Sequence, residues 1–227
     1  MKKLIFITLV LLFNANVFSQ NQHRFDGSMI ITSYKEAEKE KIKGSPYLFE
    51  EFSDGKVFFK DQKEPATYML NYNAYTNSIE FVKDGNTYQV SNTQNIDSIV
   101  INNNVMLKTI YTEDNADHDD FLIRLNNNKI KLYKKVDIYY VGAREGMSGY
   151  EKDKPAEYVR KKPEFFVSVN EKPATLIKNK KSLLSLFNND KELSSFLKKE
   201  KLNIKKEKDF IEIIHYINSK NNTLEGV

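Results

Sequence analysis

The sequence predicts an α+β fold in which an antiparallel β-meander, as a curled sheet or a partial barrel, precedes three short C-terminal helices. Between about residues 28 and 140, apolar and polar residues alternate with a period of two, as is typical of half-buried strands. Short Asn- and Gly-containing turns separate these runs, which favours antiparallel neighbours over βαβ units. After about residue 180 the apolar residues change to helical spacing.

The alternating runs define the strands one by one. The clearest hairpin joins residues 78–82 to residues 86–90 through Asp84-Gly85, because a two-residue primed turn needs positive φ. The apolar phase changes within the last long run, which predicts a bend near Lys134. A Gly- and Pro-rich linker is expected at 142–163. The other predicted strands are 67–73, 97–101, 107–111, 121–125, 129–140 and 164–169.

The stretch KGSPYLFEEFSDGKVFF, residues 43–59, combines turn residues with aromatic and acidic ones. Its Gly-Ser-Pro is expected to end a short charged helix at 35–43. Tyr47 and Phe49 are expected to be substantially buried against the sheet, and Asp54-Gly55 to turn the chain into a strand at 56–60. An open groove lined by these aromatic residues would instead indicate a ligand site.

Three amphipathic helices are predicted after residue 180. The first is residues 181–187, and the second is expected to be capped by Asn189, with Glu192 at the capping-box position. The third begins near Lys206, and its apolar residues stand at i, i+3, i+4 and i+7: Phe210, Ile213, Ile214 and Ile217.

Residues 1–19 predict a signal peptide, with Lys2 and Lys3 before an apolar run and small residues before Gln20. The ten residues of Leu4 to Phe13 would span about 15 Å as a helix, too little for a bilayer core of roughly 30 Å. We therefore expect a periplasmic or secreted protein, cleaved near Ser19-Gln20, whose mature form has no transmembrane helix. Its expected parts are a β-rich body at 20–150 and a segment at 151–227, in which a linker and one strand precede a basic helical end that packs on the body.

Cysteine and charge exclude several classes of protein. The chain contains no cysteine, which excludes disulfides, Cys-ligated metals and thiol nucleophiles. Without residues 1–19 it carries 33 basic and 31 acidic residues, so it lacks the basic footprint of a nucleic-acid-binding protein. Residues 151–227 are the basic part.

The acidic run YTEDNADHDDF, residues 111–121, is the best metal candidate. Carboxylate oxygens are the ligands that calcium prefers, and the spacing does not match an EF-hand. The alternative is a solvated loop whose charges repel one another. Calcium is the one cofactor that the sequence suggests, and its candidate ligands are Asp114, Asp117, Asp119 and Asp120.

Catalytic motifs are not apparent. The fragment Gly146 to Gly149 lacks the five-residue nucleophile elbow, and no two histidines stand at the i, i+4 spacing of a helical zinc site. The thirteen tyrosines could fill a half-buried sheet face or form a binding platform, and the sequence does not separate these uses.

The sequence therefore favours a non-enzymatic envelope or binding protein, with a partner in the cell envelope. One alternative is a hydrolase that uses carboxylates, which would need an enclosed pocket holding at least two carboxylates of raised pKa. The other is an interaction module that docks an acidic partner through its basic helical end, at Lys205, Lys206 and Lys208.

The signal ending in FSQ, the KGSPYL stretch, the NYNAYTNSIEF hairpin and the lysine-rich tail resemble a group of secreted Bacteroidota proteins. Proteins of this group pair a β-rich body with a lysine-rich helical end. The resemblance implies an address and an architecture and does not imply an activity.

Overall fold

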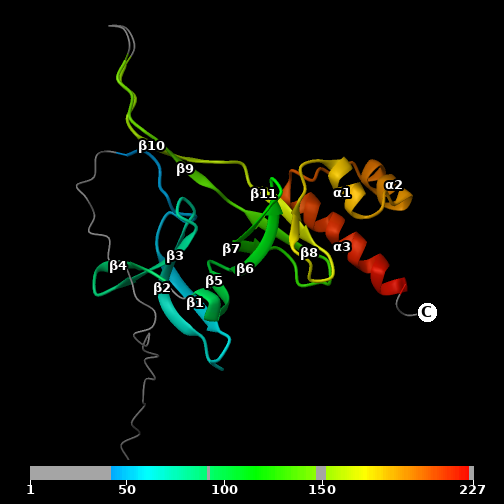
Figure 1. The fold of residues 1–227 in the computed structure, drawn as a ribbon, viewed down its shortest axis with the longest axis horizontal. Helices are drawn as coiled ribbons and strands as arrows, with labels where there is room; N and C mark the ends of the chain where they lie inside the picture. The colour runs from blue at the N-terminus through cyan, green and yellow to red at the C-terminus, as the bar shows by residue number, and fades with distance from the viewer. Residues whose placement is uncertain (1–41, 91–92, 147–151, 225–227) are drawn as a thin grey trace, which may run out of the picture.

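The computed structural model describes residues 42–90, 93–146 and 152–224. The predicted signal peptide lies outside this part, and so does the expected charged helix, except for its last two residues. The described chain holds twelve strands and three C-terminal helices, so the α+β fold class is confirmed. Figure 1 shows the β-rich body with the three helices together on one side of it, next to β8 (Lys131–Lys135) and β11 (Glu164–Ser168).

Ten strands form one sheet in the order β12-β11-β8-β7-β6-β5-β1-β2-β3-β4. Each pair along this order is antiparallel, as the predicted meander requires. The strands are β1 Ser53–Phe59, β2 Ala66–Asn73, β3 Ser78–Lys83, β4 Asn86–Gln89, β5 Ile96–Ile101, β6 Asn104–Glu113, β7 Ala116–Arg124, β8 Lys131–Lys135, β11 Glu164–Ser168 and β12 Ala174–Leu176.

The sheet closes into a five-stranded barrel because β12 also pairs with β6, here in parallel. In this register Ala174 lies opposite Tyr111, and Thr175 lies opposite Thr112. The barrel strands β6, β7, β8, β11 and β12 therefore have mixed orientation. Side chains fill the interior, namely Tyr111, Leu122, Tyr133, Phe166 and Ala174.

The strands β5, β1, β2, β3 and β4 extend the sheet beyond the barrel as an open wing. The alternation in β1 and β5 places Val57 and Ile99 in a separate hydrophobic core, where both are fully buried. Phe81 of β3 packs between Tyr68 and Tyr88 in the same cluster.

Asn and Asp residues with positive φ make the tight turns of the sheet. Asp84 and Gly85 have φ of 51° and 76°, which confirms the predicted hairpin turn. Asn102 and Asn103 turn β5 into β6 with φ of 47° and 62°. Such residues tolerate the left-handed region better than other non-glycine residues do.

The expectation of a turn at Asp54-Gly55 is wrong, because both residues lie inside β1. A Cβ on Gly55 would stand 2.7 Å from Leu70 Cδ1 and 2.9 Å from the Val100 carbonyl oxygen. The missing side chain therefore lets the neighbouring strands approach β1 closely, and the glycine does not serve a turn.

The helices α1 Lys180–Leu186, α2 Lys191–Lys199 and α3 Glu207–Leu224 cover the outer face of the barrel. Outward residues of β8 and β11, such as Leu132 and Phe165, pack with the predicted apolar stripe of α3. The second helix is capped by Asp190, not by Asn189 as expected: the Asp190 side chain accepts hydrogen bonds from two backbone N–H groups of the first turn.

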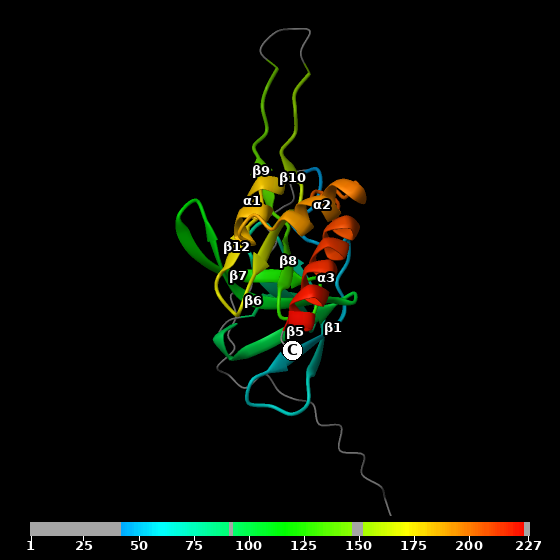
Figure 2. The ribbon, with the colours of Figure 1, turned by 90° about the vertical axis from the view of Figure 1, so that its right-hand side faces the viewer.

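The segment 142–163 is only partly the expected linker. Its residues Glu157–Arg160 form β10, which pairs with β9 (Ile138–Val141) as a two-stranded ribbon that projects from the body (Figure 2). The described residues from 152 to 224 thus hold three strands, where one was expected for 151–227. The bend in the predicted strand 129–140 falls between β8 and β9, at residues 136–137, slightly later than Lys134.

None of the helices in the described ranges is long and apolar enough to cross a membrane.

Candidate functional site

The loop before β1 is fixed to the sheet by a buried asparagine. Asn71 is fully buried, and its amide donates to the carbonyl oxygens of Phe49 at 3.0 Å and Glu51 at 3.2 Å. The Phe49 N–H donates in return to Asn71 Oδ1 at 3.3 Å. Because one buried amide binds both the N–H and the carbonyl oxygen of Phe49, the backbone conformation of this loop is fixed before any ligand binds.

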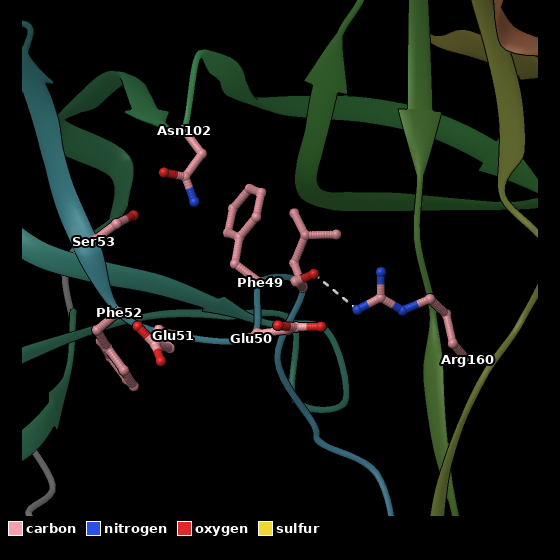
Figure 3. A pocket seen from close by; sticks show the side chains of 8 residues that line it. Phe49, Glu50, Glu51, Phe52, Ser53, Asn102 and Arg160 are labelled. Carbon is pink, nitrogen blue, oxygen red and sulfur yellow. Dashed lines mark hydrogen bonds between the residues drawn. The ribbon is translucent and has the colours of Figure 1, made fainter.

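A second fastening comes from β10, more than a hundred residues further along the chain. The Arg160 guanidinium donates from one nitrogen to the carbonyl oxygens of Tyr47 at 2.9 Å and Leu48 at 2.8 Å. Figure 3 shows this guanidinium directed at the loop from the opposite side of the site. Within the described part of the chain, its remaining N–H groups are left for solvent or a ligand.

Between these fastenings lies a groove of about 660 Å³ that is open to solvent. In Figure 3 the Phe49 ring, the Asn102 amide and the Ser53 hydroxyl turn toward a common space. The groove is lined by Leu48, Phe49, Glu50, Glu51, Phe52, Ser53, Asn102 and Arg160.

The groove carries polar groups that the described residues leave without a protein partner. Glu50 and Glu51 are exposed, and neither carboxylate forms an ion pair with a described residue. The Ser53 hydroxyl oxygen is buried and has no hydrogen-bond partner in the described part of the chain. Buried polar atoms normally find a partner, so this unsatisfied hydroxyl is an exception within the described residues.

Tyr47 and Phe49 are half-buried, which is less than the substantial burial that the sequence predicts. Tyr47 stands edge-on to Phe52 and donates from its hydroxyl to Glu80 Oε2 at 2.8 Å, so it anchors the loop to β3. Phe49 lines the groove. The stretch therefore anchors the chain to the sheet and also lines an open groove. An open groove at this place is the arrangement that would indicate a ligand site.

A second cluster of polar and charged residues lies at one end of the barrel. Lys135 Nζ lies 2.9 Å from Glu113 Oε2 and 3.4 Å from Asp137 Oδ2, and its side chain is 12 % exposed. Glu164 lies opposite Lys135 in the β8–β11 register. The ammonium also lies over the ring of Tyr111.

The pKa values of this cluster argue against nucleophilic chemistry. Burial lowers the pKa of Lys135, but its hydrogen bonds to Glu113 and Tyr111 outweigh burial and raise it. Burial and the bond that its hydroxyl donates to Asp120 raise the pKa of Tyr111. Both groups stay protonated at neutral pH, when neither is a nucleophile, so we interpret the cluster as structural.

The four predicted calcium ligands lie on the β6–β7 hairpin, which is regular and not the loop that was the alternative. Asp114 occupies the turn with φ of 48°, and Asp120 accepts a hydrogen bond from Tyr111. On the other face of β7, Asp117 accepts from Thr112 and Asp119 pairs with Lys108.

The alternation of β7 thus divides these carboxylates between two faces. In the described ranges, no group of three or more His, Asp or Glu residues could hold a metal ion. Calcium binding is thus predicted by the residue types, and the placement of these carboxylates on two faces gives it no support.

The tyrosines divide between buried and exposed positions. Tyr72 and Tyr133 fill the cores. On the ribbon, Tyr139 is 44 % exposed and Tyr140 is 41 % exposed, and Tyr158 stands edge-on to Tyr140. Tyrosine is frequent at protein interfaces, so the ribbon is a further surface that a partner could contact.

Sequence reasoning missed Ser53, Asn71, Asn102 and Arg160 as site residues. Arg160 falls in the segment taken for a linker, and Asn71 looks like an ordinary polar residue of an alternating strand. Asn102 could be placed in a turn, but its approach to the loop before β1 depends on the pairing of β5 with β1. The signals for these positions are not local.

Comparison of the chain with family models, with curated proteins and with solved structures gave no match.

Proposed function

We propose that the protein is exported and acts as a non-enzymatic binding protein. Its ligand is an extended peptide segment, carrying basic residues, of a cell-envelope partner. The observation that carries the proposal is that two carboxylates without an ion pair to a described residue, those of Glu50 and Glu51, line a preformed groove together with the Phe49 ring. Carboxylates attract lysine and arginine side chains, and the ring accepts their alkyl stems.

The rigidity of the groove supports binding. Asn71 and Arg160 hold the loop backbone from two sides, so little conformational entropy is lost when a ligand enters. The exposed Asn102 amide offers hydrogen bonds to a peptide backbone, and peptide groups in an extended segment need such partners.

The competing proposals receive less support. A hydrolase would need two carboxylates of raised pKa in an enclosed pocket, whereas Glu50 and Glu51 stand in an open groove. The alternative surface for an acidic partner consists of three lysines that are exposed near the start of α3, namely Lys205, Lys206 and Lys208. Figure 1 shows α3 on the barrel side, away from the loop that forms the groove.

Export is proposed from the features of residues 1–19, and the resemblance to secreted Bacteroidota proteins agrees with it. Mass spectrometry of the protein recovered from its native host tests this part. A mature chain that begins at Gln20 is expected, and an uncleaved chain confined to the cytoplasm would contradict export.

The binding part is tested by calorimetric titration with a blocked pentapeptide, Gly-Lys-Phe-Lys-Gly, against a matched Gly-Glu-Phe-Glu-Gly peptide. We expect the basic peptide to bind and the acidic one to bind much more weakly. Replacing Glu50 and Glu51 by Gln should weaken the basic peptide by about two- to fivefold per residue, the range for exposed ion pairs.

The control is Glu64→Gln with Glu157→Gln, which removes the same charge from exposed positions outside the groove lining. The control should bind as the wild type does. Equal affinity for the two peptides, or equal weakening by both double variants, would refute the proposed groove.

A further inference from the structure

A second cavity, separate from the groove, lies where β11, β12 and the connection before α3 meet. Its volume is about 430 Å³, within the roughly 300–1,000 Å³ usual for small-molecule sites. Phe165, Ile177 and Ile204 form its floor, and each is less than 10 % exposed. The floor is well supported, because the Ile177 N–H donates to the Phe165 carbonyl oxygen and Phe165 stands edge-on to Phe210.

Three lysines stand around the mouth of this cavity. Lys162, Lys178 and Lys205 are exposed, and a single carboxylate, that of Glu164, lines the cavity with them. Neither Lys162 nor Lys205 forms an ion pair within the described ranges. Lys178 lies 3.4 Å from Asp114, and both side chains are mostly exposed, so this pair holds the lysine weakly.

We infer that this cavity binds an amphipathic anion, a short alkyl chain with a carboxylate head. The apolar floor accepts the alkyl chain, and the lysines at the mouth attract the head. The chemistry is opposite to that of the groove, which presents unpaired carboxylates. The inference is therefore independent of the peptide-binding proposal, and either can fail without the other.

The shape of the cavity favours a small molecule over an acidic protein. A protein partner is usually held by a broad surface of about 800 Å² on each side, whereas these lysines surround a small concave opening. An acidic peptide would pair with the lysines and leave the floor of Phe165, Ile177 and Ile204 uncovered. An alkyl chain that enters the cavity removes its own apolar surface from water, at about 25 cal/mol per Å².

A ligand series separates the contributions of head and chain. Titration calorimetry at pH 7.5 would compare octanoate with acetate, octan-1-ol and a hexaglutamate peptide. Octanoate is expected to bind at least tenfold more tightly than acetate or octanol, because each of these lacks one half of the recognition. Binding of hexaglutamate without binding of octanoate would replace the inference by an acidic-protein site.

Charge variants then locate the binding. Lys162→Gln with Lys205→Gln should weaken octanoate by about two- to fivefold per lysine, while Lys180→Gln with Lys208→Gln, exposed lysines outside the cavity lining, should leave it unchanged. Glu164→Gln should act in the opposite direction and tighten octanoate, because it removes the one negative charge of the lining.

Circular dichroism of each variant confirms that the fold is kept. Unchanged octanoate affinity in the folded Lys162/Lys205 variant, or octanol binding as tight as octanoate, would overturn the inference.

Discussion

Asn218 of α3 holds the backbone of Ile130, 88 positions earlier, through two hydrogen bonds. Its Oδ1 accepts from the Ile130 N–H at 2.9 Å, and its Nδ2 donates to the Ile130 carbonyl oxygen at 3.0 Å. Asn218 is 3 % exposed and Ile130 is 2 % exposed. A buried side-chain amide on the last helix thus satisfies the backbone just before β8, so the helical layer and the barrel depend on each other.

Asn218→Ala should lower the free energy of unfolding by about 1–3 kcal/mol, the cost of leaving a buried donor unpaired. The Ile130 carbonyl keeps a bond from Asn126, so the orphaned group is the Ile130 N–H. The loss should occur although alanine is the better helix former. Urea denaturation measures it, with Glu212→Ala on the exposed face of α3 as control. A variant within 0.5 kcal/mol of the wild type would show that water replaces the amide.

Gly55→Ala should destabilise the protein by about 1–3 kcal/mol, the usual cost of overpacking a core. The new Cβ would meet Leu70 and the Val100 backbone at under 3 Å, and backbone cannot move aside cheaply. Gly142→Ala is the matched control, because no atom lies within 4 Å of its Cβ position. Denaturant midpoints of the two variants should differ clearly, and equal midpoints would contradict a close approach of the strands at Gly55.

The features that the sequence predicts well are the local ones. Asp84-Gly85 forms the expected turn because two adjacent residues suffice to set its φ angles. The apolar stripe of α3, from Phe210 to Ile217, is buried as its spacing predicts. Asp54-Gly55 misleads for the same reason: the pair has the local chemistry of a turn, and a tertiary contact with Leu70 decides its role.

The features that the sequence does not reveal depend on distant pairings. Closure of the barrel rests on β12, a three-residue strand with no usable periodicity, which pairs in parallel with β6. The groove depends on Arg160, whose partner Tyr47 is 113 residues away. No single window of the chain contains either relationship, so hydrophobic periodicity cannot predict them.

Calcium should leave the thermal midpoint unchanged. The carboxylates of the β6–β7 hairpin are divided between two faces, and Lys108, Thr112 and Tyr111 engage three of them. A site with a Kd of 10 µM would add about 2.7 kcal/mol at 1 mM calcium, which a melting curve detects readily. A midpoint that rises with calcium, and falls back in Asp117→Asn, would instead establish the site that the residue types suggest.

Glu164→Gln should stabilise the protein at neutral pH. Burial raises the pKa of Glu164, and the nearby charge of Glu113 and then that of Asp137 raise it further. The Lys135 ammonium is already paired with Glu113 and Asp137, so Glu164 is a surplus carboxylate beside one lysine.

The pH dependence of this effect has a definite sign. Because the folded pKa of Glu164 lies above its unfolded value of 4.5, the folded state holds its proton more tightly. The associated stability is present below pH 4.5 and is lost as the pH rises through the folded pKa.

The advantage of Glu164→Gln over the wild type should therefore be larger at pH 8 than at pH 4. Urea unfolding of both proteins at the two pH values measures this difference, and Glu64→Gln, at an exposed position, serves as the control. The same advantage at both pH values would mean that the variant acts through packing, and a loss of stability at pH 8 would mean that Glu164 holds Lys135 in place.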